Sequence, residues 1–223
     1  MKVSVVIPTL DEQETLPAAL AAAAEADEII VVDGGSRDAT ASIAVDHGAQ
    51  VIACRRGRGR QLECGARAAK GDVLLFVHAD TMLPAGFRRE IVELIASGHA
   101  VWGRFDLRFD RGGPLLRLIA RLISLRSRLS RVATGDQAIF ARRDAFDAVG
   151  GFHEPVLFED VDLCRRLKRF GTMGVPRSPV VTSARRWRKH GTWRTTVRMW
   201  SLKFLYLCGV PSDWLERHYD VAR

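Results

Sequence analysis

Short apolar, β-branched runs alternate with helical stretches through the first third of the chain, and this alternation limits the fold more than any other feature. The runs over 3–7, 28–32, 50–53 and 73–77 have the composition of strands. The segments between them, 14–26, 39–47 and 61–70, have helical patterns. The alternation predicts an α/β fold with a mostly parallel central sheet and helices on both faces.

The rest of the chain mixes helices and strands in a different rhythm. We expect helices over 84–97 and 115–132, a strand over 99–109, and a short helix that begins near Glu159 and ends at Gly171. No internal repeat, low-complexity tract or linker marks a boundary. The chain is therefore predicted to form one domain over residues 1–223.

Charge is divided unevenly between the two halves. The net charge is +8, but residues 1–100 hold ten Lys and Arg against fourteen Asp and Glu, whereas residues 101–223 hold twenty-four against twelve. The second half is predicted to face an anionic partner.

The cysteines and the N-terminal residues indicate the compartment. Four cysteines without a C-x-x-C spacing argue against a zinc site and a disulfide-stapled secreted fold, and they favour a reduced, cytoplasmic setting. Pro8 and Asp11 interrupt the first apolar run too early for a signal peptide, and no run approaches the ~20 residues of a membrane span. We expect a cytoplasmic protein that is soluble or peripheral on the cytoplasmic membrane.

Polar residues follow the predicted strands at the edge where parallel sheets bind ligands. Asp33 could accept hydrogen bonds from a base or ribose, or it could belong to a tight turn in which Ser36 caps the next helix. His78 and Asp80 have a two-residue spacing that, at an extended strand end, directs both side chains to one side. A carboxylate there can bind Mg²⁺ or Mn²⁺ together with diphosphate oxygens. His78 suits Mn²⁺ better than Mg²⁺, and a packed or solvated histidine is an equal alternative.

Two other charged sets allow both a functional and a structural interpretation. Glu159 and Asp160 could supply a general base, or they could be acids that satisfy a helix dipole. Arg58 and Arg60 lie between glycines ahead of a helix, which suits phosphate contact or a flexible basic loop.

The segment over 115–131 is amphipathic and contains no acid. Arginines fall on one face and leucines on the opposite face, with Arg126 out of place among the leucines. A helix with its leucines in the core is the plainer interpretation, and a helix on an anionic membrane surface is the alternative. The two faces comprise Arg117, Arg121, Arg128 and Arg131, and Leu118, Leu122, Leu125 and Leu129.

Basic residues surround Trp187, Trp193 and Trp200 near the C-terminus. Tryptophans in such a setting could anchor at a membrane interface, pack in a core or stack on nucleic acid bases. The sequence contains no nucleic-acid-binding module, so nucleic acid is not expected as a partner.

Five segments occur in an order that resembles the inverting family 2 glycosyltransferases of the GT-A fold, and the resemblance spans nearly the whole chain. They are "VVIPTLDEQETL", "EIIVVDGGSRDAT", "GDVLLFVHADT", "TGDQAIFARR" and "FEDVDLCRRL". "GDQAIF", "FEDVDL" and "VVTSARRW" together are most similar to the small bacterial branch associated with radical-SAM/selenodomain gene neighbourhoods. The resemblance implies a nucleotide-binding half over 1–80, an acceptor and catalytic half over 81–184, and a basic helical segment over 185–223.

The resemblance also implies roles for individual residues. The metal motif of the family is D-x-D; Asp80 matches its last position, whereas His78 stands at the first. Asp160 matches the catalytic base, with Glu159 beside it. Donor-binding residues would be Pro8, Glu12, Asp33, Arg58, His78 and Asp80; Gly135 and Asp136 would border the acceptor; Arg185, Arg186 and His190 would close over the diphosphate.

These roles imply transfer of one sugar from a nucleotide sugar, most simply UDP-linked, to a small or lipid-linked acceptor, with Mn²⁺ or Mg²⁺ as cofactor. A sugar-nucleotide pyrophosphorylase is disfavoured because "PTLDEQ" follows the first strand where such enzymes have a glycine-rich G-x-G-T-R-L loop. The alternative is a degenerate, non-catalytic relative that binds an anionic membrane or a partner, which the departure at His78 would permit.

Overall fold

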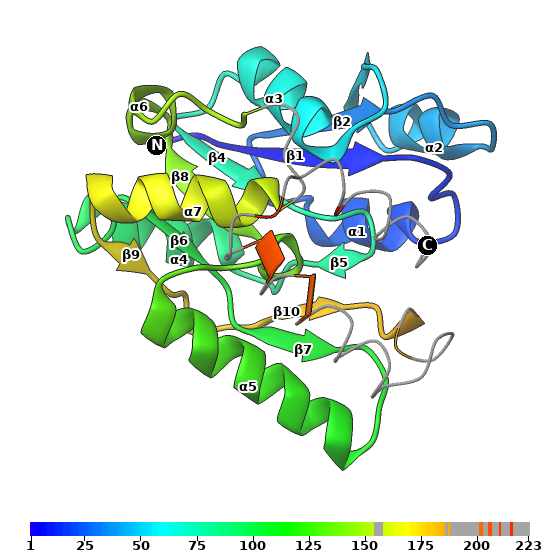
Figure 1. Cartoon of the computed structure of the whole chain (residues 1–223). Coiled ribbons are helices and arrows are strands. Elements are labelled where there is room, and N and C mark those ends of the chain that lie inside the picture. Colours follow the sequence, from blue (N-terminus) through cyan, green and yellow to red (C-terminus); the bar gives the residue numbers. More distant parts are fainter. Residues whose placement is uncertain are drawn as a thin grey trace.

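The central sheet has seven strands, and its core is built by the predicted apolar runs. The computed structural model describes residues 1–153 and 158–185 and, beyond them, residues 187, 201, 202, 205, 206, 210 and 215. The four predicted N-terminal strands are confirmed and run parallel, whereas β8 is antiparallel to both its neighbours (Figure 1). The strand order is β3 (Gln50–Ala53), β2 (Glu28–Asp33), β1 (Val3–Thr9), β4 (Val73–Phe76), β8 (Ile139–Arg142), β6 (Trp102–Arg104) and β9 (Met173–Gly174).

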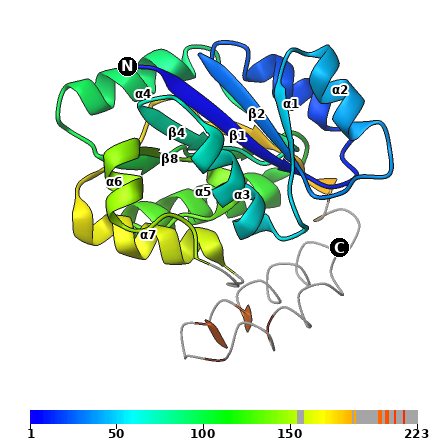
Figure 2. The ribbon, with the colours of Figure 1, turned by 90° about the horizontal axis from the view of Figure 1, so that it is seen from above.

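Helices cover both faces of this sheet, as the alternation predicts. Successive β1 side chains point to opposite faces, so Val5 and Ile7 belong to one apolar cluster and Val6 to the other. Figure 2 shows the sheet between the two helical layers. One layer holds α1 (Leu16–Ala22), α2 (Thr40–Asp46) and α4 (Phe87–Ala96); the other holds α3 (Arg58–Ala68), α6 (Arg143–Ala148) and α7 (Glu159–Phe170).

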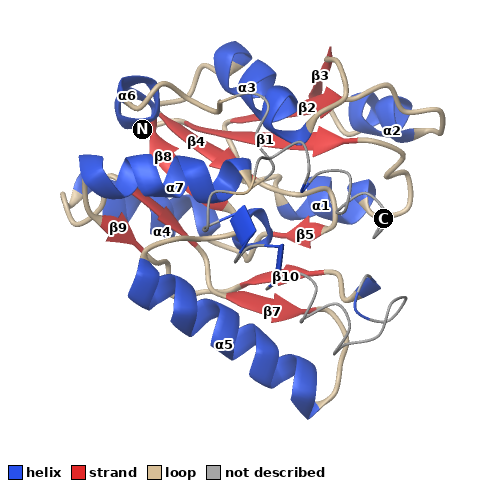
Figure 3. Cartoon of the chain, in the orientation of Figure 1, coloured by secondary structure: helices blue, strands red, loops and turns tan. Residues whose placement is uncertain are grey.

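A second, three-stranded sheet makes the predicted single strand over 99–109 wrong. The chain leaves the large sheet after β6 and enters the small one as β7, so Phe105 and Asp106 lie between two strands. Arg104 causes the break: its side chain is fully buried, pairs with Asp106, and donates to the Ser124 carbonyl at 2.9 Å. The small sheet has the order β5 (Thr81–Met82), β10 (Val180–Thr182), β7 (Leu107–Phe109) (Figure 3).

The long helix α5 (Pro114–Ser130) packs beside β7 with the opposite orientation to the plainer prediction. Its inward side chains include Ala120, Ser124 and Ser127, which are small and buried. The predicted core leucines Leu118, Leu122, Leu125 and Leu129 are exposed instead, together with Leu115. The interpretation of this helix as one with a leucine core face is therefore wrong.

The cysteines also differ from expectation. Cys54, just after β3, and Cys64, in α3, form a disulfide, which the absence of a C-x-x-C spacing did not predict. Cys164 in α7 is buried, does not belong to this disulfide, and accepts from the Ala133 amide at 3.4 Å. In the described part of the chain, no helix combines the length and hydropathy needed to cross a bilayer.

Candidate functional site

The carboxyl ends of β1 and β2 are tied together by a buried glutamine. The Gln61 side chain on α3 donates to the carbonyl oxygens of Thr9 at 2.8 Å and Val32 at 2.9 Å. The Thr9 carbonyl also accepts from the Gly34 amide at 2.9 Å, so Gln61 uses the second lone pair of that oxygen. The rim that carries Pro8 and Asp33 is therefore held rigidly against α3.

Asp33 holds the turn after β2. One carboxylate oxygen accepts from the backbone amides of Gly35 at 3.1 Å and Ser36 at 2.9 Å, and the other accepts from the hydroxyls of Ser36 and Thr9. Four donors fill the usual accepting positions of a carboxylate. Contact between Asp33 and a nucleotide stays a prediction, and it would require one of the two hydroxyls to turn away.

Ser36 does not cap the next helix, because its hydroxyl binds Asp33. The helix begins later, at Thr40, and Asp38 accepts from the Thr40 amide at 2.9 Å. The prediction of Ser36 as the helix cap is wrong for this reason. The Ser36 hydroxyl also accepts from the Asp11 amide at 2.9 Å, and this hydrogen bond joins the loop after β1 to the loop after β2.

Three predicted donor residues that are far apart in sequence meet at this rim. Arg185 forms an ion pair with Glu12 at 3.4 Å, with half of the arginine side chain exposed. The Ser183 amide donates to the Asp80 carbonyl at 3.1 Å, which brings the segment after β10 against the segment after β4. Glu12, Asp80 and Arg185 thus lie on adjoining segments, where a diphosphate would need both a cation and a metal.

His78 and Asp80 occupy a turn, so the prediction that they extend a strand is wrong. β4 ends at Phe76, and the Thr81 amide donates to the His78 carbonyl at 3.0 Å. The imidazole of His78 packs against Gly135, where any side chain would collide with the ring. Gly135 is therefore required by the position of His78.

Glu159 and Asp160, which we call the acid pair, lie at the N-terminus of α7, and both side chains are buried. Asp160 accepts from the Gly135 amide and from the Val161 amide, each at 2.6 Å. Glu159 forms an ion pair with Arg58 at 3.7 Å, with the glutamate 5% exposed. This one helix start thus contacts two distant motifs, through Gly135 with Asp160 and Arg58 with Glu159, and neither contact was predicted.

Phe158 fixes the direction in which α7 begins. Its φ of 71° is in the left-handed region, which bulky side chains rarely adopt. Such strain persists where surrounding contacts hold it, and it is common beside functional residues. Here the strained residue directly precedes Glu159 and Asp160.

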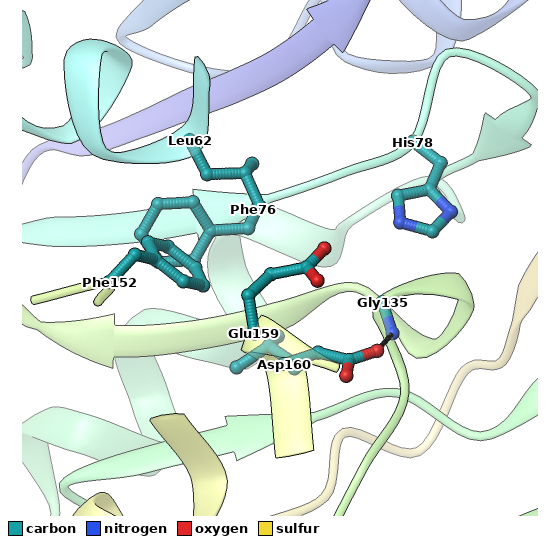
Figure 4. A pocket seen from close by; sticks show the side chains of 8 residues that line it. Leu62, Phe76, His78, Gly135, Phe152, Glu159 and Asp160 are labelled. Atoms are coloured by element: carbon teal, nitrogen blue, oxygen red, sulfur yellow. Dashed lines mark hydrogen bonds between the residues drawn. The ribbon is translucent and has the colours of Figure 1, made fainter. Parts of the chain in front are cut away.

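A pocket lies between the acid pair and His78. Figure 4 shows Glu159 and Asp160 on one side, His78 across from them, and aromatic rings forming one wall. The rings of Phe76 and Phe152 meet edge to face with centroids 4.8 Å apart. The lining residues are Leu62, Phe76, His78, Gly135, Ile139, Phe152, Glu159 and Asp160.

Arg126 also belongs to this region, although the sequence pattern predicted no role for it. It turns inward from α5, and burial lowers the pKa of its guanidinium, with the charges of Asp136 and Asp160 acting in the opposite direction. Its Nε is buried and makes no hydrogen bond to any described residue. The signal was available: Arg126 was the one arginine that did not fit the amphipathic pattern.

The donor set fits a divalent cation whose coordination the substrate completes. No group of three or more His, Cys, Asp or Glu side chains suited to a metal occurs within the described ranges 1–153 and 158–185 or the few described residues beyond them. Mg²⁺ and similar ions are commonly held by one or two carboxylates and the phosphates of the substrate. Metal binding of this kind at Asp80, with His78, stays a prediction.

Comparison with known proteins decides the family. Residues 4–152 match the family described as "Glycosyl transferase family 2". The chain belongs to this family. Its fold is the GT-A fold, and the prediction of fold class is confirmed.

The first relative is an uncharacterized glycosyltransferase of Mycobacterium tuberculosis, 40% identical over 104 residues, which are 46% of this chain and 48% of that protein. The match thus spans about half the length of the relative. A second is the undecaprenyl-phosphate 4-deoxy-4-formamido-L-arabinose transferase of Pseudomonas fluorescens, 35% identical over 44% of this chain and 33% of its own length. Among solved structures, glucosyl-3-phosphoglycerate synthase of Mycobacterium tuberculosis, in complex with Mn²⁺, UDP-glucose and phosphoglyceric acid, matches with a TM-score of 0.63 and 25% identity. That match covers 94% of this chain and 80% of the synthase chain.

Two predicted diphosphate residues, Arg186 and His190, lie outside the described residues, as do Trp193 and Trp200. Trp187 is described, and its ring packs against Phe109 of β7 with centroids 5.5 Å apart. This contact makes Trp187 part of the packing of the small sheet.

Proposed function

We propose that this chain transfers one sugar from a nucleoside-diphosphate sugar to an acceptor hydroxyl in a single inverting displacement. The observation that carries the proposal is the position of Asp160, which is buried, faces the pocket and is held by the Gly135 amide at 2.6 Å. Each of its oxygens accepts one backbone amide and keeps a lone pair for a proton. Asp160 removes the proton from the acceptor hydroxyl as that oxygen attacks the anomeric carbon.

The leaving nucleoside diphosphate departs toward the rim that carries Glu12, Asp80 and Arg185. Arg185 reaches this rim through its ion pair with Glu12, so its charge is available to the departing phosphates. Mn²⁺ or Mg²⁺ held by Asp80, with His78, would neutralise the leaving group. The co-crystallised Mn²⁺ and UDP-glucose of the mycobacterial synthase support a UDP-linked donor for this chain as well.

The acceptor is proposed to be a small or lipid-linked molecule that carries an anionic group. Arg126 supports this part of the proposal, because its buried Nε lies on the acceptor side without a hydrogen bond to any described residue. Two proteins similar to this chain have phosphate-bearing acceptors in their names or complexes, undecaprenyl phosphate and phosphoglyceric acid. Membership of the branch associated with radical-SAM/selenodomain neighbourhoods, and the division into segments 1–80, 81–184 and 185–223, stay predictions.

The donor site is tested by thermal unfolding with a panel of nucleoside diphosphates and nucleotide sugars, with and without Mn²⁺. A ligand at a hundred times its Kd stabilises the folded protein by ~2.7 kcal/mol. We expect UDP and a UDP-sugar to raise the Tm only with Mn²⁺, and Asp80→Asn to abolish the rise. A matched control is Asp72→Asn, an exposed carboxylate on the loop before β4.

The second candidate is a non-catalytic, binding-only relative, which the histidine at position 78 of the metal motif favours. It predicts no Tm shift with any nucleotide, with or without metal. A shift that is equal in wild type and Asp80→Asn would instead retain the donor and reject the role of Asp80.

A further inference from the structure

Five leucines form an exposed stripe along α5. They are spaced three or four residues apart, and their exposed fractions run from 40% to 78%. Of the eight exposed large hydrophobic residues in the described part of the chain, these are five. Contiguous apolar surface of this kind marks an interaction site. We name it the leucine stripe: Leu115, Leu118, Leu122, Leu125 and Leu129.

Polar contacts on the opposite face keep the leucines outside. The Ser124 carbonyl accepts from the buried Arg104, and the Ser124 hydroxyl accepts from the Leu107 amide at 3.1 Å. The Ser127 hydroxyl accepts from Gln137 at 2.9 Å. Rolling α5 to bury its leucines would leave these polar groups unsatisfied in the core, where each loses its desolvation compensation. The outward stripe is thus fixed by the contacts of the inward face.

The charge around the stripe is of one sign. At 100° per residue, Arg117, Arg121 and Arg128 fall along one side of the leucines, and all three are exposed. α5 itself contains no Asp or Glu. Arg128 does pair with Asp106 at 2.6 Å, but Asp106 belongs to the loop before β7. An apolar stripe beside cationic side chains is the composition of helices that lie in the interface of an anionic membrane.

We propose that α5 docks this protein on an anionic lipid surface, with the leucine stripe in the headgroup and acyl boundary and the arginines at the phosphates. The helix is ~26 Å long at 1.5 Å per residue, so the stripe presents an extended line of contact. A second copy fits less well, because helix pairs of this kind rely on opposite charges beside the apolar seam. Two copies of α5 would place arginines together with no carboxylate of the helix between them.

The position of α5 links the lipid surface to the acceptor side of the pocket. Leu122 and Leu129 are the i−4 and i+3 neighbours of Arg126, whose guanidinium is within the electrostatic reach of Asp136 and Asp160. Arg126 therefore neighbours the stripe along α5 and interacts electrostatically with Asp160 of the acid pair. This arrangement selects a lipid-linked acceptor with an anionic headgroup over a small soluble one. That choice of acceptor rests on the proposed function, whereas membrane docking does not.

Co-sedimentation of the full-length protein with vesicles tests the docking surface. We compare phosphatidylcholine vesicles with vesicles that also contain phosphatidylglycerol, using wild type and the combined Leu118→Gln, Leu122→Gln and Leu125→Gln variant. Wild type should bind the anionic vesicles, and the variant should bind at least about tenfold more weakly, since it loses the burial of three apolar side chains in the lipid. Arg117→Gln with Arg121→Gln should weaken binding by about fivefold per arginine and reduce its salt dependence.

The matched control removes exposed apolar side chains elsewhere. Val45 on α2 and Phe170 at the end of α7 are exposed by 61% and 47%, so Val45→Gln with Phe170→Gln should leave vesicle binding unchanged. Equal binding by wild type and the leucine variant, or no binding by wild type, overturns the proposal. A concentration-dependent dimer in sedimentation velocity that the leucine substitutions abolish would assign the stripe to a second copy and also overturn it.

The nucleotide-dependent Tm shift is measured on the same samples. If the leucine variant loses vesicle binding but keeps the UDP-dependent Tm shift, both the docking surface and the donor site are supported. If the leucine variant loses vesicle binding and UDP shifts the Tm of neither wild type nor variant, the docking surface is supported and the transferase function is rejected. A failure of the docking surface and a failure of the proposed function therefore give different results.

Discussion

The proposed donor side and the proposed acceptor side satisfy their charges in different ways. On the donor side Asp33 is bound by four donors of its own loop region, and Glu12 is paired with Arg185. On the acceptor side the hydrogen bonds to Asp160 from described residues come from two backbone amides, and the buried Nε of Arg126 has no hydrogen-bond partner among the described residues. The donor side is shaped in advance, whereas the acceptor side keeps polar groups for the substrate. Substitutions on the acceptor side should therefore affect turnover most.

The largest effect is expected from Asp160→Asn. The amide is nearly the same size and can still accept from Gly135, but it cannot take a proton, so kcat should fall by ~10²–10⁴. Donor binding should stay nearly unchanged, because a base acts in the transition state. Nucleotide release from the donor sugar gives kcat, and the UDP-dependent Tm shift gives binding.

Glu159→Gln is the matched control for this prediction. It removes the charge that pairs with Arg58 at 3.7 Å while keeping the side-chain length, and it should reduce kcat far less than Asp160→Asn. Equal loss of turnover and of the UDP shift in Asp160→Asn would assign this residue to the structure of the helix start and would contradict its role as a base.

Arg126→Gln should have the next largest effect, on the acceptor alone. A hydrogen bond to a charged group contributes ~1.5–3 kcal/mol, so the acceptor KM should rise by about 10- to 100-fold with a smaller change in kcat. Arg126→Lys keeps the charge and should recover part of the loss. Steady-state kinetics against acceptor concentration separate the two parameters.

Arg128→Gln is the control on the same helix. Its side chain is half exposed and pairs with Asp106, so with a water-soluble acceptor analogue, which does not depend on membrane docking, the acceptor KM should not change. A similar rise in KM for both variants would mean that α5 has shifted as a whole, and Arg126 would then have no direct role.

The predictability of each element depends on how far away its partners are in the sequence. The strands over 28–32 and 73–77 could be predicted because a run of apolar residues is buried whatever surrounds it. The prediction of one strand over 99–109 is wrong at Arg104. The burial of Arg104 depends on Asp106 and on Ser124, which lies twenty residues further along the chain. The amphipathic pattern of α5 defined two faces but not which one faces inward.

The site shows the same limit. Spacing alone left Glu159 and Asp160 between a base and helix-end acids, and neither spacing nor the resemblance predicted their contacts with Gly135 and Arg58. Arg126 does not fit the amphipathic pattern, but the pattern predicts no role for it. Its electrostatic environment depends on Asp136 and Asp160, which lie 10 and 34 positions further on. Three-dimensional contacts between distant residues supply what periodicity cannot.

The smallest expected effect concerns the ion pair that closes the donor rim. Arg185→Gln should weaken UDP binding by at most about fivefold if Arg185 acts mainly through Glu12, because a half-exposed pair at 3.4 Å contributes only ~0–1 kcal/mol. Added salt should reduce the difference between wild type and variant. Arg89→Gln, which breaks the exposed pair with Glu93 on α4, is the control and should leave UDP binding unchanged. A loss much greater than fivefold for Arg185→Gln would mean that the guanidinium leaves Glu12 and contacts the diphosphate directly, so that the donor side rearranges on binding.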